Sequence, residues 1–286
     1  MAGGMVRAID VHIHPPGPGG ESLTSSREAR EYFRAAAPAA SVEEMAEYYA
    51  RLDIFGVLFT VDAETSTGQA PVPSNDYVAE IARRYPTQFV AFASVDPWKG
   101  KAALKEIERC VGELGVRGLK FMPNMQRFYP NDERFYPIWE LAEQMGLVVL
   151  IHSGTTGVGV GRPGGGGIKL KYSRPIPYID DVAADFPGLK IIMAHPAWPW
   201  QEEQLAVLVH KPNVYMDLSG WSPKYFQPSL IQYANTLVQD KVLFGSDYPV
   251  ISPERWLEDF DKAGFRDEVR PKILLENARR VLSLDV

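Results

Sequence analysis

Asp10-Val11-His12-Ile13-His14 ends a short apolar run that begins at Val6 and is followed by Pro15-Pro16-Gly17. The β-branched residues and the Pro-Gly stop predict a β-strand. Side chains two residues apart in a strand point to the same face, so His12 and His14 project together from its carboxyl end. Two neutral imidazoles side by side form half of a divalent metal site. The alternative is a pair of hydrogen-bonded polar residues at a strand end.

Three further apolar runs of strand length also end at an ionisable residue. They are residues 148–151 before His152, residues 190–194 before His195 and residues 241–246 before Asp247. In a parallel barrel the carboxyl ends of the strands converge on one mouth, where active sites lie. The pattern therefore predicts a metal-ligand set from scattered segments, with His195 beside it: His12, His14, His152 and Asp247.

Strand and helix patterns alternate along the rest of the chain. Strands are expected at 6–14, 56–61, 89–95, 116–122, 148–152, 190–195, 214–218 and 241–246. Helices are expected at 41–52, 74–85, 100–114, 133–145, 178–186, 202–209, 229–238, 254–262 and 267–282. The alternation implies a parallel sheet with helices outside, and eight repeats imply closure. The expected fold is a distorted α/β TIM barrel, (β/α)8, that forms a single domain over residues 1–286.

The composition is that of an ordinary globular protein. The 286 residues carry a formal net charge of −6, with 45% hydrophobic and 23% charged residues. A nucleic-acid partner would call for a basic stripe, and a membrane span for about 20 consecutive apolar residues, and neither is present. Met1–Asp10 lacks the apolar centre of a signal peptide, so a cytoplasmic location is expected. Cys110 is the only cysteine and is expected to be a small core residue.

Two long segments follow predicted strands and are expected to be active-site loops. Residues 15–40 contain an early cluster of prolines and glycines and a short helix expected at 25–36. Residues 153–174 contain eight glycines between Ser153 and Gly167, followed by Lys169, Lys171 and Arg174. Glycine lets backbone amides approach a ligand closely, and the nearby cations favour an anion. The first segment is either a cover for the site or a surface insert, and the second is either a lid or anion-binding segment or a plain flexible loop.

Lys120 lies inside the otherwise apolar strand expected at 116–122. A buried lysine is costly unless its ammonium reaches a partner or the barrel mouth. Three interpretations remain open: an electrostatic contact to an anionic substrate, a carbamylated lysine that bridges two metals, or a side chain that extends to the solvent at the rim.

Other candidate substrate contacts follow the strands expected at 116–122 and 190–195. Arg127 and Tyr129 lie in the first of these loops, and Trp198-Pro199-Trp200 lies in the second. Trp198 and Trp200 suit a wall for an apolar or aromatic substrate, although core packing under the lid is equally compatible with the pattern. Together with Lys169 and Lys171, these residues predict a small anionic substrate that has an aromatic or apolar part.

The sequence resembles the amidohydrolase superfamily, and within it amidohydrolase family 2. The resemblance runs from the motif at residues 9–14 to Glu276-Asn277-Ala278-Arg279-Arg280-Val281-Leu282. Between them, in the expected order, stand Leu150-Ile151-His152, Met193-Ala194-His195-Pro196 and residues 244–249, Phe-Gly-Ser-Asp-Tyr-Pro.

The resemblance implies one catalytic divalent metal, usually zinc with manganese or another ion as alternatives, held by His12, His14, His152 and Asp247. It implies that His195 acts on the metal-bound water or on the substrate. A centre of three imidazoles and one carboxylate can bind a substrate oxygen or lower the pKa of bound water toward ~7. Asp247 can also relay a proton. By analogy with the family, a homodimer is the expected assembly.

Three functions are compatible with this site. The first is a metal-dependent hydrolase that directs an activated water at a carbonyl of a carboxylated or acyl-CoA substrate. The Gly-rich segment and the tryptophans resemble a subgroup that cleaves a carbon–carbon bond of aryl β-ketoacyl-CoA thioesters. The second is a metal-dependent, non-oxidative decarboxylase of an aromatic or muconate-like acid. The third is a non-catalytic barrel with a structural metal, against which stands His195 beside the ligand set.

Overall fold

The computed structural model describes residues 6–21, 31, 35 and 41–286, and within them it contains eight parallel strands. The strands are β1 Ala8–Ile13, β2 Ile54–Leu58, β3 Phe89–Ala91, β4 Gly118–Phe121, β5 Val148–His152, β6 Lys190–Ala194, β7 Val214–Asp217 and β8 Val242–Leu243. Two continuous ladders join them, in the orders β1-β2-β3 and β4-β5-β6-β7-β8. Parallel bridges between Ala93 and Leu119 and between Ile13 and Tyr248 connect the two ladders at both ends. The sheet therefore closes, and the predicted TIM barrel is confirmed.

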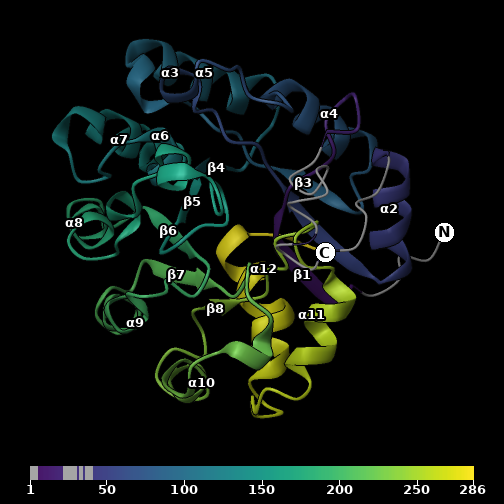
Figure 1. Ribbon diagram of the computed structural model, residues 1–286. Helices are drawn as coiled ribbons and strands as arrows, with labels where there is room; N and C mark the ends of the chain where they lie inside the picture. The colour runs from purple at the N-terminus through teal and green to yellow at the C-terminus, as the bar shows by residue number, and fades with distance from the viewer. Residues whose placement is uncertain (1–5, 22–30, 32–34, 36–40) are drawn as a thin grey trace.

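Helices form a ring outside the strands (Figure 1). The α-helices are α2 Val42–Arg51, α3 Glu64–Thr67, α4 Asn75–Arg84, α5 Lys101–Gly112, α6 Pro123–Gln126, α7 Tyr136–Gln144, α8 Tyr178–Asp185, α9 Gln201–His210, α10 Pro228–Ala234, α11 Pro253–Phe260 and α12 Asn277–Leu282. Short 3-10 helices are η1 Pro97–Lys99, η2 Glu133–Phe135, η3 Pro163–Gly167, η4 Leu170–Ser173 and η5 Pro223–Tyr225, and η6 Lys272–Glu276 is a π-helix. The hydroxyls of Ser41 and Ser74 cap α2 and α4 by accepting a backbone N–H, as their sequences predict.

Several strands are shorter than the sequence predicts. β3 ends at Ala91, although Phe92 and Ala93 still donate to backbone carbonyls of Leu58 and Gly118, and the side-chain oxygen of Asn75 then accepts the N–H of Ser94. β8 ends at Leu243, because the N–H of Phe244 bonds to the carbonyl of Ile273 in η6. The side chain of Asn75 and the helix η6 thus accept backbone N–H groups near the barrel mouth in place of a neighbouring strand. The residues beyond β3 and β8 can therefore turn into the site.

Much of the early loop lies outside the described residues. This applies to most of the segment expected at 15–40 and to most of the helix expected at 25–36. Among the described residues, no helix combines the length and the apolar composition needed to cross a bilayer. Cys110 is fully buried in the core, as expected, and burial raises the pKa of its thiol to about 12.

A ring of aromatic side chains packs α7 onto β4. Trp139 is fully buried, its ring centre lies 5.0 Å from that of Phe121, and its indole N–H donates to the carbonyl of Pro130 at 2.8 Å. We expect Trp139→Ala to lower the free energy of unfolding by about 3–5 kcal/mol, since it leaves a large cavity. Urea unfolding measures this change, and Trp198→Ala is the matched control because Trp198 is 51% exposed. A loss below about 1 kcal/mol, within the range of an ordinary surface substitution, would contradict this account of the packing.

Candidate metal centre

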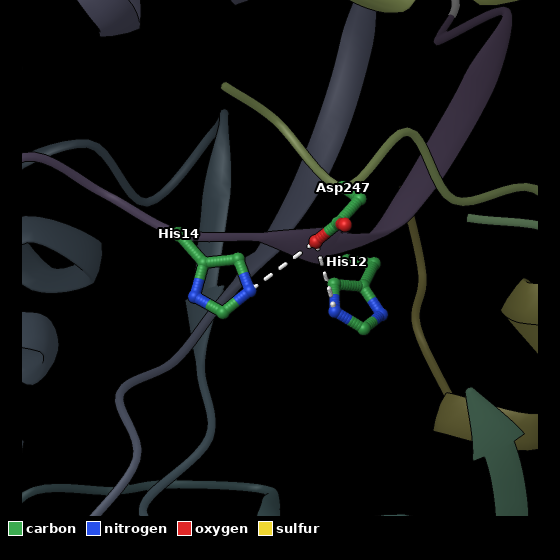
Figure 2. Close-up of side chains that lie close together, drawn as sticks. All are labelled: His12, His14 and Asp247. Atoms are coloured by element: carbon green, nitrogen blue, oxygen red, sulfur yellow. Dashed lines mark ion pairs between the residues drawn. The ribbon is translucent and has the colours of Figure 1, made fainter. Parts of the chain in front are cut away.

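Three candidate metal ligands meet where the first strand lies beside the segment that follows β8. Figure 2 shows the imidazoles of His12 and His14 on either side of the carboxylate of Asp247. Oδ1 of Asp247 lies 3.4 Å from Nε2 of His12 and 3.3 Å from Nε2 of His14. All three ligand atoms lie within 4.8 Å of one another. Residues that are far apart in the sequence therefore share one centre at the barrel mouth.

Backbone hydrogen bonds fix this meeting. The N–H of Asp247 donates to the carbonyl of His12 at 3.0 Å, and the N–H of His14 donates to the carbonyl of Tyr248 at 2.9 Å. Asp247 has a φ of 66°, in the left-handed region that non-glycine residues seldom adopt. Such strain is found most often where surrounding contacts hold a functional side chain in place. The carboxylate is thus directed between the two histidines by its own backbone.

Asp10 also connects β1 to the segment that follows β8, through hydrogen bonds to its buried carboxylate. Its Oδ1 accepts the N–H of His12 at 3.1 Å and the N–H of Ser246 at 2.9 Å. Its Oδ2 accepts the hydroxyls of Tyr49 and Ser246. Burial raises the pKa of Asp10 to about 7, although the hydrogen bonds that it accepts oppose the shift. Asp10 was not among the predicted site residues, although its position two residues before His12 on the same strand is a signal of its role.

Asp217, at the end of β7, orients the ring of His12. Its Oδ2 lies 3.0 Å from Nδ1 of His12, while its Oδ1 accepts the backbone N–H groups of His195 and Ser219. If Nδ1 carries the proton in this pair, the lone pair of His12 is left on Nε2, which faces Asp247. A carboxylate behind a ligating imidazole commonly fixes its tautomer and orientation. Asp217 therefore supports the candidate centre without belonging to its ligand trio.

We expect Asp217→Asn to weaken metal binding by about 10–100-fold, the usual effect of losing a carboxylate partner behind a histidine ligand. The amide keeps the size of the side chain but does not carry the negative charge that favours the N–H tautomer at Nδ1. Competition with a chromogenic chelator measures the dissociation constant. Asp259→Asn is the control, because the half-buried Asp259 on α11 accepts a hydrogen bond from Ser222 and not from a histidine. An unchanged constant in the folded variant would mean that Asp217 has only a structural role.

His195 and His152 lie on the other side of His12. The ring centre of His195 is 4.7 Å from that of His12 and 4.7 Å from that of His152. Ser219 Oγ lies 2.8 Å from Nδ1 of His195 and 3.0 Å from Nδ1 of His12, and so links the two rings. His152 is not in the compact trio, because its Nε2 faces the carbonyl of Thr155 at 3.1 Å. The five residues predicted from strand ends are therefore neighbours, although His152 points toward its own loop.

Burial sets the protonation of the site. Burial, reinforced by the charge of Lys120, lowers the pKa of His12 to about 3. Burial also lowers the pKa of His152, with His195 adding to the effect, and burial lowers the pKa of His195. For Asp247 burial alone would raise the pKa, but the hydrogen bond with His14 and the nearby imidazoles hold it at about 2. At neutral pH these histidines are neutral and the carboxylate is ionised.

Lys120 reaches this site from within β4. It is 2% exposed, and its Nζ lies 3.3 Å from Nε2 of His12 and 4.6 Å from the ring centre of Phe59. The interpretation of a side chain that extends to solvent at the rim is therefore wrong. Burial lowers the pKa of Lys120 to about 8, against the attraction of Asp217 and Asp247. The ammonium thus stands beside the candidate ligands as a buried cation.

The other predicted substrate contacts lie farther out on the mouth loops. Lys171 lies 5.4 Å from the ring centre of Tyr129, and Lys169, Lys171 and Arg127 are exposed. Trp198 is 51% exposed and lies 6.5 Å from Trp221, so it is not core packing, whereas Trp200 is half-buried. Among the interactions of the described residues, no contact links any of these side chains directly to the histidines.

The inner residues fit a divalent cation. Neutral imidazole nitrogens and an ionised carboxylate are donors that zinc and manganese accept. Beside the histidines, two ionised carboxylates, the buried Asp217 and the largely buried Asp247, stand against one ammonium, that of Lys120, in the described part of the chain. Uncompensated buried negative charge is costly, and a cation at the trio would offset it. The charge balance and the donor set therefore both favour a divalent cation at the trio.

The family follows from a sequence comparison. A profile of the family described as Amidohydrolase matches residues 9–284. The chain belongs to the amidohydrolase family. This makes it an enzyme of the amidohydrolase type, and it confirms the resemblance given by the strand-end motifs.

Individual proteins also resemble the chain in sequence or in fold. A 2-amino-3-carboxymuconate-6-semialdehyde decarboxylase from Dictyostelium discoideum is 24% identical over 241 residues, which cover 74% of this chain and 66% of that protein. The uncharacterised TIM-barrel protein Bb4693 from Bordetella bronchiseptica is 28% identical, with a TM-score of 0.80 over 96% of this chain and 98% of the other. A dihydroxybenzoic acid decarboxylase from Polaromonas sp. JS666, with bound manganese and 2-nitroresorcinol, is 18% identical, with a TM-score of 0.65 over 99% and 98%.

Proposed function

We propose that this amidohydrolase is a metal-dependent decarboxylase that releases CO2 from a small aromatic or muconate-like carboxylic acid. The observation that carries the proposal is the buried ammonium of Lys120, 3.3 Å from Nε2 of His12. A buried cation next to a metal centre favours an anionic substrate. The decarboxylase relative from Dictyostelium supports the same class of reaction.

The proposed centre holds one divalent ion, zinc or manganese, on His12, His14, His152 and Asp247. The compact trio of His12, His14 and Asp247 supports this set, and the manganese in the Polaromonas structure supports a divalent metal. When bound, the ion supplies positive charge that attracts substrate oxygens and stabilises developing negative charge. Asp217 keeps the ring of His12 in the orientation that this binding needs.

The remaining chemistry falls to two side chains of this chain. The bond between the carboxyl carbon and the neighbouring carbon breaks, and CO2 leaves. The electron pair of this bond stays on the neighbouring carbon, which then takes up a proton in place of CO2. Lys120 holds the anionic acid in place through its ammonium. His195, linked through Ser219 to His12, moves the proton at its ring nitrogen, and Asp247 offers a second route for it.

The outer mouth residues contact the rest of the substrate in this proposal. Trp198 and Trp200 cover its apolar part. The cations and the phenol of the neighbouring loops meet its polar groups: Arg127, Tyr129, Lys169 and Lys171. The partner is a small molecule, and we propose that a single domain over residues 1–286 binds it within a homodimer. Sedimentation analysis at several protein concentrations tests the assembly.

A product assay tests the reaction. Metal-loaded protein is incubated with dihydroxybenzoates, with aminocarboxymuconate semialdehyde and with an aryl β-ketoacyl thioester, while CO2 and free carboxylic acid are measured in parallel. The expected result is one CO2 for each acid consumed, and none after the metal has been removed by a chelator. Release of a carboxylic acid without CO2 would favour the hydrolase instead. Metal binding without either product would favour a non-catalytic barrel.

A further inference from the structure

One phenyl ring, that of Phe59, contacts three polar side chains of the candidate site. Its ring centre lies 4.6 Å from Nζ of Lys120, 4.8 Å from the ring centre of His12 and 4.8 Å from that of His14. Both imidazoles stand nearly perpendicular to the phenyl ring, at 82° and 77°. Phe59 is fully buried, and it belongs neither to the proposed ligand set nor to the proposed substrate contacts.

The position of this ring is fixed from two sides. Phe59 directly follows β2, and its backbone N–H donates at 3.4 Å to the carbonyl of Ile13, the residue between the first two candidate ligands. Its side chain belongs to the apolar cluster that also contains Val11 of β1. Side chains in such close-packed interiors have little freedom to move. The ring is therefore a rigid surface against which the neighbouring polar groups rest.

The ammonium of Lys120 has few partners for a buried cation. Among the described residues it has one hydrogen-bonding neighbour, Nε2 of His12 at 3.3 Å, and it forms no ion pair. Asp217 and Asp247 attract it only as more distant charges. The face of an aromatic ring carries negative charge and attracts a cation that lies within about 6 Å of the ring centre. The ring of Phe59 is therefore the second direct contact of this ammonium.

The contact with Phe59 matters most when His12 serves as a metal ligand. Nε2 of a neutral imidazole has one lone pair, which serves either an ammonium or a metal ion. A bound divalent ion would also repel the nearby ammonium. The ring of Phe59 attracts the ammonium without neutralising it, whereas a carboxylate in that place would cancel the charge that an anionic substrate needs.

We infer that Phe59 is a positioning residue, whose ring face holds the ammonium of Lys120 at the place where an anionic ligand meets it. Without this ring, Asp217 and Asp247 would draw the ammonium toward themselves and weaken its attraction for the ligand. The inference rests on the proposed function, in which Lys120 holds the acid, and it adds the residue that keeps this cation in place.

A double-mutant cycle tests whether Phe59 acts through Lys120. Titration calorimetry on metal-loaded protein measures the affinity for benzoate and for benzamide, which has nearly the same shape but no charge. The variants are Phe59→Leu, Lys120→Met and the two combined. Phe260→Leu is the matched control, because Phe260 on α11 is also fully buried and has the guanidinium of Arg270 5.1 Å from its ring centre.

Thermal unfolding verifies that each variant is folded, and elemental analysis measures its metal content. If Phe59→Leu does not fold, a trifluorinated phenylalanine at position 59 takes its place in the cycle. Fluorine withdraws negative charge from the ring face and leaves the shape of the side chain nearly unchanged. A role in packing alone would not respond to this replacement.

Wild type and Phe260→Leu should bind benzoate more tightly than benzamide, and Phe59→Leu should reduce this preference about 3–30-fold, the range of a buried cation–π contact. Added to Lys120→Met, the same change should alter the preference by less than about 2-fold, because the interaction partner is gone. The metal content of Phe59→Leu should stay near that of wild type.

Three results would overturn the inference and leave the decarboxylase proposal intact. They are an unchanged preference in Phe59→Leu, an equal effect in the Lys120 and Lys120→Met backgrounds, and a loss of metal, which would assign the ring to the histidines instead. A wild type that did not prefer benzoate over benzamide would contradict the contact between Lys120 and the acid in the proposed function, and the role of Phe59 with it.

Discussion

Alanine in place of His14 is expected to abolish metal binding while leaving the barrel folded. His14 is 19% exposed and its imidazole contacts the carboxylate of Asp247, so its loss disturbs little packing. Removing a partner behind a ligand already costs about 10–100-fold in metal affinity, and removing a ligand should cost more than about 100-fold. Elemental analysis of dialysed protein should find about one ion per chain in wild type and almost none in the variant.

His210→Ala is the matched control for this experiment. His210 ends α9 and lies beside Lys211, outside the candidate centre. Its replacement should leave both the metal content and the thermal unfolding temperature near those of wild type. A full complement of metal in folded His14→Ala would remove His14 from the proposed ligand set. The trio at the barrel mouth would then not be the metal site.

Alanine in place of His195 is expected to give the opposite pattern: metal retained and turnover lost. The ring of His195 lies between those of His12 and His152, but it is not part of the trio around Asp247. A positioned proton donor or acceptor contributes about 10²–10⁴-fold to a reaction rate, so the rate of product formation should fall by that factor. The same elemental analysis measures the metal, and the CO2 assay measures the rate.

The Ser219→Ala variant distinguishes proton transfer by His195 from the orientation of its ring. The Ser219 hydroxyl links Nδ1 of His195 to Nδ1 of His12, on the ring side away from the Nε2 atom that faces Asp247. We expect a smaller loss of rate than in His195→Ala, with metal content preserved. Turnover that persists in metal-loaded His195→Ala would exclude His195 from the proton transfer. Loss of metal in His195→Ala would instead make His195 part of the metal centre.

The sequence predicts the inner site because the carboxyl ends of the strands in a closed parallel barrel lie close together in space. His12, His14 and Asp247 each follow an apolar run, and closure brings such positions to one mouth. The same reasoning anticipates His195 and His152 as neighbours, but not the turn of His152 toward Thr155, which depends on the path of its loop.

Side-chain partners were beyond this reasoning. Asp10 takes its role from Ser246, which is distant in the chain, and spacing alone does not reveal such a pair. Strand lengths were overestimated for a related reason, since Asn75 and η6 replace backbone partners that an apolar pattern would assign to the sheet.

The bridge between Ile13 and Tyr248 joins the first and last strands of the cylinder directly beside the metal ligands. The candidate site therefore lies across the line at which the first strand meets the segment that follows the last strand. During synthesis, a nascent chain carries His12 and His14 long before Asp247 has left the ribosome. Metal capture by the complete trio would therefore have to wait for Asp247, and a product terminated before that residue would keep the two histidines but lack the carboxylate between them.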